Sequence, residues 1–430
     1  MAKPLTFVDL FSGAGGMSVG FARREGFRLV GAVDIEQGKP SGGPGVTDCN
    51  STYTANLGVV PVAENMFDLT PEAFRAEVKR RSGVDLKPGS LGVLSACPPC
   101  TDFSRAKPTN HVIDGDRNDL ARRVGDFVEY FRPRHIVIEN AREFLRGRFS
   151  HHALALVERL KAAEYSVATD IRYLSDFGLP QVRERALITA SRIGEARTLE
   201  ELWEGYHVEA GIMTVRTALS RLAAWKVRNP ISDAADVAPG FRDDVRTRLE
   251  AVPRDGGSWF DLPRQKGGLE MLTPSMRVRW DTKDLGSHPD VYGRMWWDRP
   301  APTVKRECAH VGNGRYTHPE ETRLLTVREM ASIQGFPFDY KFKGALASRY
   351  RQIGDAVPPV VSYQVSALVR WMETGVRPTV DEFVLPELGP DGHRRYDYAG
   401  SRAAPPRARP GPTHGRSRVV RGHTRFSPGT

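Results

Sequence analysis

Two apolar segments of the chain each end close to a residue that could do chemistry. The segment 91–96 leads through Cys97-Pro98-Pro99 to Cys100, and the segment 135–138 leads directly to Glu139. The carboxyl ends of parallel strands meet at one edge of a sheet, which is where open α/β sheets bind ligands. We therefore expect a thiol and a carboxyl group side by side at that edge. Attack by a thiolate next to a carboxylic acid is one way to activate an unreactive ring carbon.

Each of these residues also has a simpler explanation. Cys97 and Cys100 form a CxxC pair, which is found in some redox and zinc sites, although zinc would need two further ligands and only two other cysteines are present. Cys100 could also be a buried, inert cysteine. The polar stretch that follows it is more typical of a loop than of a core. Glu139 could be an acid at a helix N-terminus, where the helix dipole favours negative charge.

Two further motifs could bind a ligand. A glycine-rich turn at 12–16 follows the first apolar segment, and Asp34 ends the second. Such a turn lets backbone N–H groups approach a ligand, and the acid can accept hydrogen bonds from ribose hydroxyls. The pair fits a dinucleotide, S-adenosylmethionine, or only a tight strand–helix turn. Arg183 and Arg185 share one face of an extended segment. They are either solvated surface residues or guanidinium groups directed at a carbonyl oxygen or a phosphate.

Length and composition describe an ordinary globular protein. The chain has 430 residues, 40% hydrophobic and 27% charged, which is enough for a sizeable core and two domains. No apolar run approaches the ~20 residues of a membrane span, and the segment 1–9 is too weakly apolar for a secretory signal. Four cysteines make no disulfide framework, so we expect a reducing, cytoplasmic location.

The net charge is concentrated at one end of the chain. It totals +10, but residues 394–430 contain nine Arg, no Lys and one acid, so they account for +8. The remainder is nearly neutral, and overall charge therefore does not establish nucleic-acid binding. This terminal segment is rich in Pro, Arg and Gly and poor in apolar residues, so we expect it to be disordered.

Strands alternate with helices over the first 190 residues, which predicts a mostly parallel α/β sheet. After about residue 191 this alternation is lost, which indicates a second, irregular domain. Helical patterns return at 326–334 and 360–372. The expected strands are 6–10, 28–33, 91–96, 135–138, 166–174 and 186–189, and the expected early helices are 17–24, 120–131 and 153–163.

Taken together, the motifs resemble the DNA (cytosine-5) methyltransferase family. Six matches stand in the family order and cover roughly residues 5–190 and 299–375, which makes them far more specific than any one alone. They are Asp9-Leu10-Phe11-Ser12-Gly13-Ala14-Gly15-Gly16, Pro98-Pro99-Cys100, Glu139-Asn140-Ala141, Gln181-Val182-Arg183-Glu184-Arg185, Arg323-Leu324-Leu325-Thr326-Val327-Arg328-Glu329 with Gln334-Gly335-Phe336-Pro337, and Gly354-Asp355-Ala356-Val357-Pro358-Pro359.

The resemblance implies a doubly wound, mostly parallel α/β sheet of the S-adenosylmethionine-dependent methyltransferase type. It divides the chain into a catalytic and cofactor-binding domain (1–190), a target-recognition domain (191–325), a return to the catalytic domain (326–376) and a Pro/Arg-rich tail (377–430), which we expect to be disordered. The implied activity is transfer of a methyl group from S-adenosyl-L-methionine to C5 of a flipped-out cytosine in double-stranded DNA. A restriction-modification or phage-defence setting is implied, with a cognate restriction or defence component as a further partner, and we expect a monomer.

The resemblance also implies residue roles. Cys100 would attack cytosine C6, Glu139 would act at N3, Arg185 would bind O2, and Arg183 would support the site or a phosphate. No metal site is expected, and Ser104 and Thr303 would contact the DNA. The cofactor-binding residues would be Phe11, Ser12, Gly13, Ala14, Gly16, Asp34, Ile35, Asn65, Met66, Pro99, Leu120, Asp355 and Ala356.

Three residues depart from the family pattern. Thr101 replaces the usual Gln, Asn65 the usual Asp, and Asp355 the usual Asn near the carboxylate end of the cofactor. At the last position two like charges would repel unless a water or an Arg lies between them. Three other readings remain: a tRNA cytosine methyltransferase, whose usual Cys-Phe-Thr is not found, a catalytically silent DNA-binding relative, and, more distantly, an NAD oxidoreductase.

Overall fold

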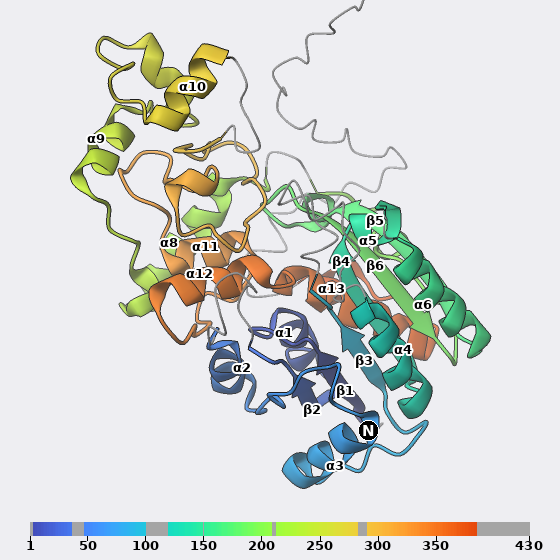
Figure 1. Cartoon of the computed structure of the whole chain (residues 1–430). Helices are drawn as coiled ribbons and strands as arrows, with labels where there is room; N and C mark the ends of the chain where they lie inside the picture. Colours follow the sequence, from blue (N-terminus) through green and yellow to red (C-terminus); the bar gives the residue numbers. More distant parts are fainter. Residues whose placement is uncertain are drawn as a thin grey trace, which may run out of the picture.

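The computed structural model describes residues 3–36, 47–99, 119–148, 150–208, 212–282 and 290–384. Its centre is a six-stranded sheet in the order β2-β1-β3-β4-β6-β5 (Figure 1). The predicted α/β class is confirmed, and all six expected strands are present with shifted ends. The strands are β1 (Leu5–Leu10), β2 (Phe27–Val33), β3 (Val93–Ala96), β4 (His135–Ala141), β5 (Ser166–Tyr173) and β6 (Glu184–Ser191).

One strand runs against the rest. β1 to β4 are parallel, whereas β6 is antiparallel to both of its neighbours, β4 and β5. The link from β5 to β6 contains only the 3-10 turn η3 (Leu174–Phe177). A parallel return would need a longer crossover, usually through a helix, so this short link makes the pair antiparallel.

Alternate residues of each strand face two separate cores. Val8, Leu94 and Ile136 point into one core with α3, α4 and α6, while Phe7 and Val93 point into the other with α1 and α13. This period of two is what a sheet covered on both faces requires. The helices of the first part are α1 (Gly16–Ala22), α2 (Cys49–Leu57), α3 (Pro71–Ser82), α4 (Leu120–Phe131), α5 (Glu143–Arg146) and α6 (His151–Ala162).

From about residue 215 the chain between β6 and the C-terminal helices forms a third core outside the sheet, whereas 196–208 and 212–213 pack in the core with α1 and α13. α9 and α10 lie farthest from the strands (Figure 1). We call residues 215–325 the middle region. The remaining elements are α7 (Leu199–Leu202), α8 (Val215–Arg228), η4 (Ala234–Asp236), α9 (Asp243–Ala251), η5 (Trp259–Arg264), α10 (Pro274–Thr282), η6 (Val311–Asn313), α11 (Val327–Ile333), α12 (Leu346–Asp355), α13 (Pro359–Thr374) and α14 (Val380–Phe383).

The C-terminal helices belong to two different cores. Buried residues of α11 and α12, such as Met330 and Ile353, share the core of the middle region. Buried residues of α13, such as Val365, pack with α1 against the sheet. The segment 326–376 thus joins the middle region to the sheet, and the domain boundaries proposed from the sequence remain predictions.

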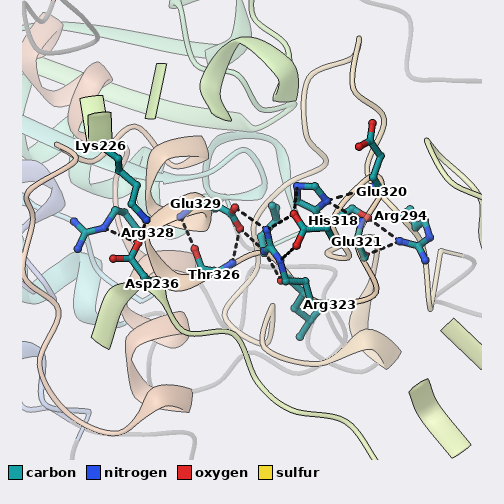
Figure 2. Close-up of polar contacts among 12 residues, drawn as sticks. Lys226, Asp236, Arg294, His318, Glu320, Glu321, Arg323, Thr326, Arg328 and Glu329 are labelled. Atoms are coloured by element: carbon teal, nitrogen blue, oxygen red, sulfur yellow. Dashed lines mark hydrogen bonds and ion pairs between the residues drawn. The ribbon is translucent and has the colours of Figure 1, made fainter. Parts of the chain in front are cut away.

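A chain of polar contacts ties the middle region to α11 (Figure 2). Arg323 pairs with Glu321 at 2.7 Å and with Glu329 at 2.6 Å. Glu329 also completes a capping box with Thr326 at the start of α11. One residue before Glu329, Arg328 pairs with Asp236 of η4 at 3.1 Å. These pairs fix the start of α11 against two separate parts of the middle region.

The structure differs from the sequence-based expectation at the start of the tail. Residues 377–384 are ordered, and α14 carries a capping box between Thr379 and Glu382. Phe383 is fully buried and its ring lies 5.1 Å from that of Trp203. Two apolar residues three positions apart, Val380 and Phe383, are enough to dock one helical turn. Residues 385–430 lie outside the described part of the chain.

Candidate active site

A cavity of about 310 Å³ opens at the carboxyl ends of β1 to β4. In this sheet β1 adjoins both β2 and β3, so the chain reverses its direction of winding there, as expected for a ligand site in an open α/β sheet. Of the site residues predicted from the sequence, those lining the cavity are Phe11, Ser12, Gly13, Ala14, Gly16, Asp34, Ile35, Asn65, Met66, Pro99, Leu120, Glu139, Arg183, Arg185, Asp355 and Ala356.

The glycine-rich turn after β1 packs tightly on the segment that follows α12. Gly13 and Gly15 have positive φ values of 49° and 90°. A Cβ atom on Gly16 would lie 2.2 Å from the carbonyl oxygen of Val357, so a larger residue would displace that segment. The Ser12 hydroxyl is buried, faces no hydrogen-bond partner among the described residues, and lines the cavity. An unpaired buried hydroxyl is costly unless a ligand or a water satisfies it.

Asp34 is fixed in place by backbone groups. Its two carboxylate oxygens accept hydrogen bonds from the N–H of Gly13 at 2.9 Å and of Glu36 at 2.7 Å. The thiol of Cys49 donates to the same carboxylate at 3.4 Å. Its two oxygens offer about four acceptor sites and three are used here, so the carboxylate can accept one further hydrogen bond from a ligand hydroxyl. The carboxylate therefore suits a ribose.

Asp355 has an ion-pair partner in the cavity wall. Arg306, which also lines the cavity, pairs with it at 2.9 Å. The sequence analysis noted that two like charges would repel here unless a water or an Arg lies between them, and Arg306 is close enough to offset the charge of Asp355. Arg306 itself was not predicted as a site residue. No motif marks it, because the contact joins two segments that are 49 positions apart in the chain.

Glu139 and Arg185 form an ion pair at one wall of the cavity. The Arg185 Nε lies 3.0 Å from Glu139 Oε1, and both side chains are largely buried. Their meeting follows from the register of β4 and β6, where Ala141 lies opposite Arg185 and Glu139 is the diagonal neighbour on the same face. Glu139 was expected just after a strand, but β4 continues through it because its pairing with β6 extends to Ala141.

Arg183 is almost fully buried and donates to three backbone carbonyls, those of Val304 at 3.0 Å, Gly354 at 3.4 Å and Ala356 at 3.2 Å. A guanidinium has five N–H donors and can satisfy several carbonyls at once. Arg183 therefore joins the segment before Arg306 to the segment around Asp355. Thr303 is not among the lining residues, and its hydroxyl donates to the carbonyl of Val182 at 2.6 Å.

The described segment that leads to the predicted nucleophile ends at the same wall, with Pro98 and Pro99 in the lining. Cys100 and Ser104 lie outside the described residues. Asn140 donates to the carbonyl of Pro98 at 3.1 Å and so anchors the chain just before Cys100. Burial, together with the charges of Glu139 and Asp9, raises the pKa of the Cys97 thiol well above its ordinary value. Cys97 therefore stays protonated, and it packs against the core that contains Phe7 and Val93.

Asp9 is a further cavity residue to which the sequence reading gave no role. It is buried at the end of β1, and Ser18 and Ser95 both donate to it at 2.5 Å. Burial raises its pKa from 3.8 to about 6, although the two hydroxyl donors oppose that shift. Its place in the same motif as Phe11 could have identified it. Arg351, which also lines the cavity, had no such signal.

The donor set fits a nucleoside cofactor such as S-adenosylmethionine. One part of the lining offers the apolar side chains of Phe11, Ile35 and Leu120, and another offers the Asp34 carboxylate and the orphaned Ser12 hydroxyl. The volume lies at the lower end of the range of about 300–1,000 Å³ that small-molecule sites span.

Within the described ranges no helix is long and apolar enough to cross a membrane.

Comparisons with known proteins identify the family of the chain. The family model described as C-5 cytosine-specific DNA methylase matches residues 5–369. The chain is 29% identical over 378 residues to the Type II methylase M.HgiDII of Herpetosiphon aurantiacus, covering 84% of this chain and 94% of that protein. It is 28% identical over 372 residues to the Type II methyltransferase M1.HphI of Haemophilus parahaemolyticus, covering 86% and 88%.

A solved structure shares the fold. It is that of a protein assigned as a DNA modification methyltransferase encoded within a prophage (Escherichia coli). The TM-score is 0.55 at 20% identity, and the match covers 86% of this chain and 99% of that one.

Proposed function

The chain belongs to the C-5 cytosine-specific DNA methylase family, and from this premise we propose that it methylates C5 of a flipped-out cytosine within a specific sequence of double-stranded DNA. The enzyme class, DNA (cytosine-5)-methyltransferase, follows from the family. The observation that carries the proposal is the cavity that joins a glycine-rich turn and a ribose-type acid to the Glu139–Arg185 pair. A methyl donor and an acceptor base would meet in that cavity.

S-adenosyl-L-methionine, when bound, supplies an activated methyl group. Phe11 and Ile35 would hold the two faces of its adenine, and Asp34 would accept a hydrogen bond from a ribose hydroxyl. Asn65, Met66 and Leu120 would border the adenine edge, and the turn at 12–16 would hold the amino-acid portion with Pro99 nearby. All of these described residues line the cavity.

The base would be activated by three side chains. C5 of cytosine is a weak nucleophile, and attack of the Cys100 thiolate at C6 turns C5 into an enamine carbon. The electron pair displaced toward N3 would be met by a proton held by Glu139, while Arg185 would donate to O2. After C5 takes the methyl group, its proton would pass to a water molecule, the electron pair left behind would expel the Cys100 thiolate from C6, and N3 would return its proton to Glu139. Arg183, through its three carbonyl contacts, would keep the two flanking segments in place.

DNA would approach from the side of the middle region. A base inside a duplex is out of reach of this cavity, so the target must flip out, at a cost of a few kcal/mol. Ser104 would close on the flipped base, Thr303 would lie near the backbone, and side chains of the middle region would read base edges in the major groove. Two relatives carry Type II methylase names, which supports a bacterial restriction-modification or defence setting with a companion enzyme.

Bisulfite sequencing tests the proposal directly. The purified protein is incubated with unmethylated plasmid DNA and S-adenosylmethionine, and cytosines protected from conversion are mapped. Protection of one cytosine within a recurring short sequence is expected. A parallel reaction with tRNA tests the alternative substrate. Protection in tRNA but not in DNA, or in neither, would contradict the proposal.

A further inference from the structure

Arg306 and Asp355 form a compact charged pair at one end of the cavity. Their side chains lie 2.9 Å apart, and 18% of Arg306 and 46% of Asp355 is exposed. Both residues line the cavity together with Arg351, which has no ion-pair partner within the described ranges. This wall therefore presents two guanidinium groups and one carboxylate.

The backbone holds this pair in a fixed arrangement. A Cβ atom on Gly354 would lie 2.3 Å from the carbonyl oxygen of Lys305 and 2.5 Å from the nitrogen of Arg306, so the two segments touch without a side chain between them. Arg183 bonds the carbonyls of Val304 and Gly354, one in each segment. These contacts fix the two segments relative to each other, so the pairing of Arg306 with Asp355 is held by the backbone and is not a chance contact of two surface side chains.

The pair also lies next to the glycine-rich turn. Gly16 packs on the carbonyl of Val357, two positions after Asp355. A ligand held by that turn would bring its nearest charged group close to Asp355. The carboxylate alone would repel an anionic group there, whereas Arg306 cancels its charge and Arg351 adds a positive one.

We propose that Arg306 is a positioning residue that neutralises Asp355 so that this end of the cavity accepts the carboxylate of an amino-acid-bearing nucleoside. The inference rests on the proposed function and deepens it, because it assigns recognition of the amino-acid portion of S-adenosylmethionine to an Arg–Asp pair. Asp355 alone would repel the carboxylate of the ligand, and the positive charge of Arg306 offsets this repulsion.

The test compares two nucleoside ligands in isothermal titration calorimetry. S-adenosylhomocysteine carries the amino-acid portion, and 5′-methylthioadenosine lacks it. Arg306→Ala should weaken binding of S-adenosylhomocysteine about tenfold or more, the scale of one uncompensated charge near the ligand. It should leave binding of 5′-methylthioadenosine within about twofold of the wild type. An equal loss for both ligands would show that Arg306 only supports the fold and would overturn the proposal.

The double variant Arg306→Ala/Asp355→Asn decides whether charge is the cause. Removing the carboxylate as well should restore most of the affinity for S-adenosylhomocysteine. Measuring Asp355→Asn alone completes a double-mutant cycle, in which the effects of the two substitutions on this affinity should depart from additivity by about tenfold. No restoration in the double variant would contradict charge compensation. If the wild-type protein binds neither nucleoside, the proposed function fails instead, and that outcome is seen before any variant is measured.

Discussion

The sheet and the middle region each bury a charge, but the charges have opposite signs. Asp9 at the end of β1 is fully buried and is held by two serine hydroxyls. Arg294 in the middle region is equally buried and donates to the carbonyls of Leu249 at 3.0 Å and Val252 at 3.2 Å. It also donates to the carbonyls of His318 at 3.1 Å and Glu321 at 2.6 Å (Figure 2). Neither has an ion-pair partner among the described residues.

The difference reflects how each region satisfies its backbone. In the sheet, the strand ladders use the N–H and C=O groups, so side chains are left to shape the cavity. The middle region has short helices and irregular links, whose carbonyls would otherwise be unpaired. Arg294 and Arg315 fill that role, the latter by donating to the carbonyls of Gly256 and Gly257. A buried charge thus lines the cavity in one region and satisfies backbone carbonyls in the other.

Neutralising one charged side chain at the sheet edge and one in the middle region should affect different properties, activity in the first case and stability in the second. At the sheet edge, Glu139→Gln keeps the volume and a hydrogen-bonding group but removes the proton that would be held at N3. Methyl transfer should fall by about 10²–10⁴, the usual contribution of a general acid or base. The thermal unfolding midpoint should stay close to the wild-type value. Transfer within tenfold of the wild type would show that Glu139 is not the acid.

In the middle region, Arg294→Met should act on the fold instead. It leaves at least three buried carbonyls unpaired, which should lower the free energy of unfolding by about 3–5 kcal/mol. Chemical denaturation followed by tryptophan fluorescence measures this. Arg216→Met is the matched control, because Arg216 is exposed and pairs with Asp298 at the surface. Similar stabilities of the two variants would contradict the role given to Arg294.

The buried carboxylate predicts a pH effect with a definite sign. The pKa of Asp9 in the folded protein is about 6, above its ordinary 3.8, so the folded state binds the proton more tightly than the unfolded chain. This contribution is complete below about pH 4 and is lost as the pH rises through 6. Relative to Asp9→Asn, the wild type should lose about 1–2 kcal/mol of stability between pH 5 and pH 7.5. Urea denaturation at both pH values checks this, and parallel profiles would contradict it.

The smallest expected effect is on DNA affinity, and it concerns the positive charge of the C-terminal segment, which is part of neither the sheet nor the middle region. Residues 394–430 carry eight of the ten net positive charges. Deleting them should flatten the slope of log affinity against log salt for duplex DNA, because fewer counterions are released. The methylated sequence should stay the same. Filter binding at several salt concentrations measures the slope, and a changed methylation site would show that these residues read bases.

Prediction from the sequence succeeded where local pattern and motif coincide. The central strands β1, β3 and β4 are short, largely buried runs, and the motifs with Phe11, Pro99 and Glu139 lie at or just after their carboxyl ends. The residues at that edge of the sheet could therefore be named in advance. The antiparallel direction of β6 was missed, because it depends on a short link rather than on the strand itself. Arg306 and Arg294 were missed because their partners are distant in the chain. A single arginine forms no periodic pattern and no motif that could identify its role from the sequence.

The most direct test of the account is whether the two ends of the cavity can be disabled separately. Methyl transfer to duplex DNA and the affinity for S-adenosylmethionine are measured for Cys100→Ala, Cys97→Ser and Asp34→Ala. Cys100→Ala should abolish transfer and keep the affinity, and Cys97→Ser should keep both to a substantial degree. Asp34→Ala should weaken the affinity by about 1–3 kcal/mol, the scale of hydrogen bonds to a charged acceptor. Transfer by Cys100→Ala at near the wild-type rate would contradict the central claim.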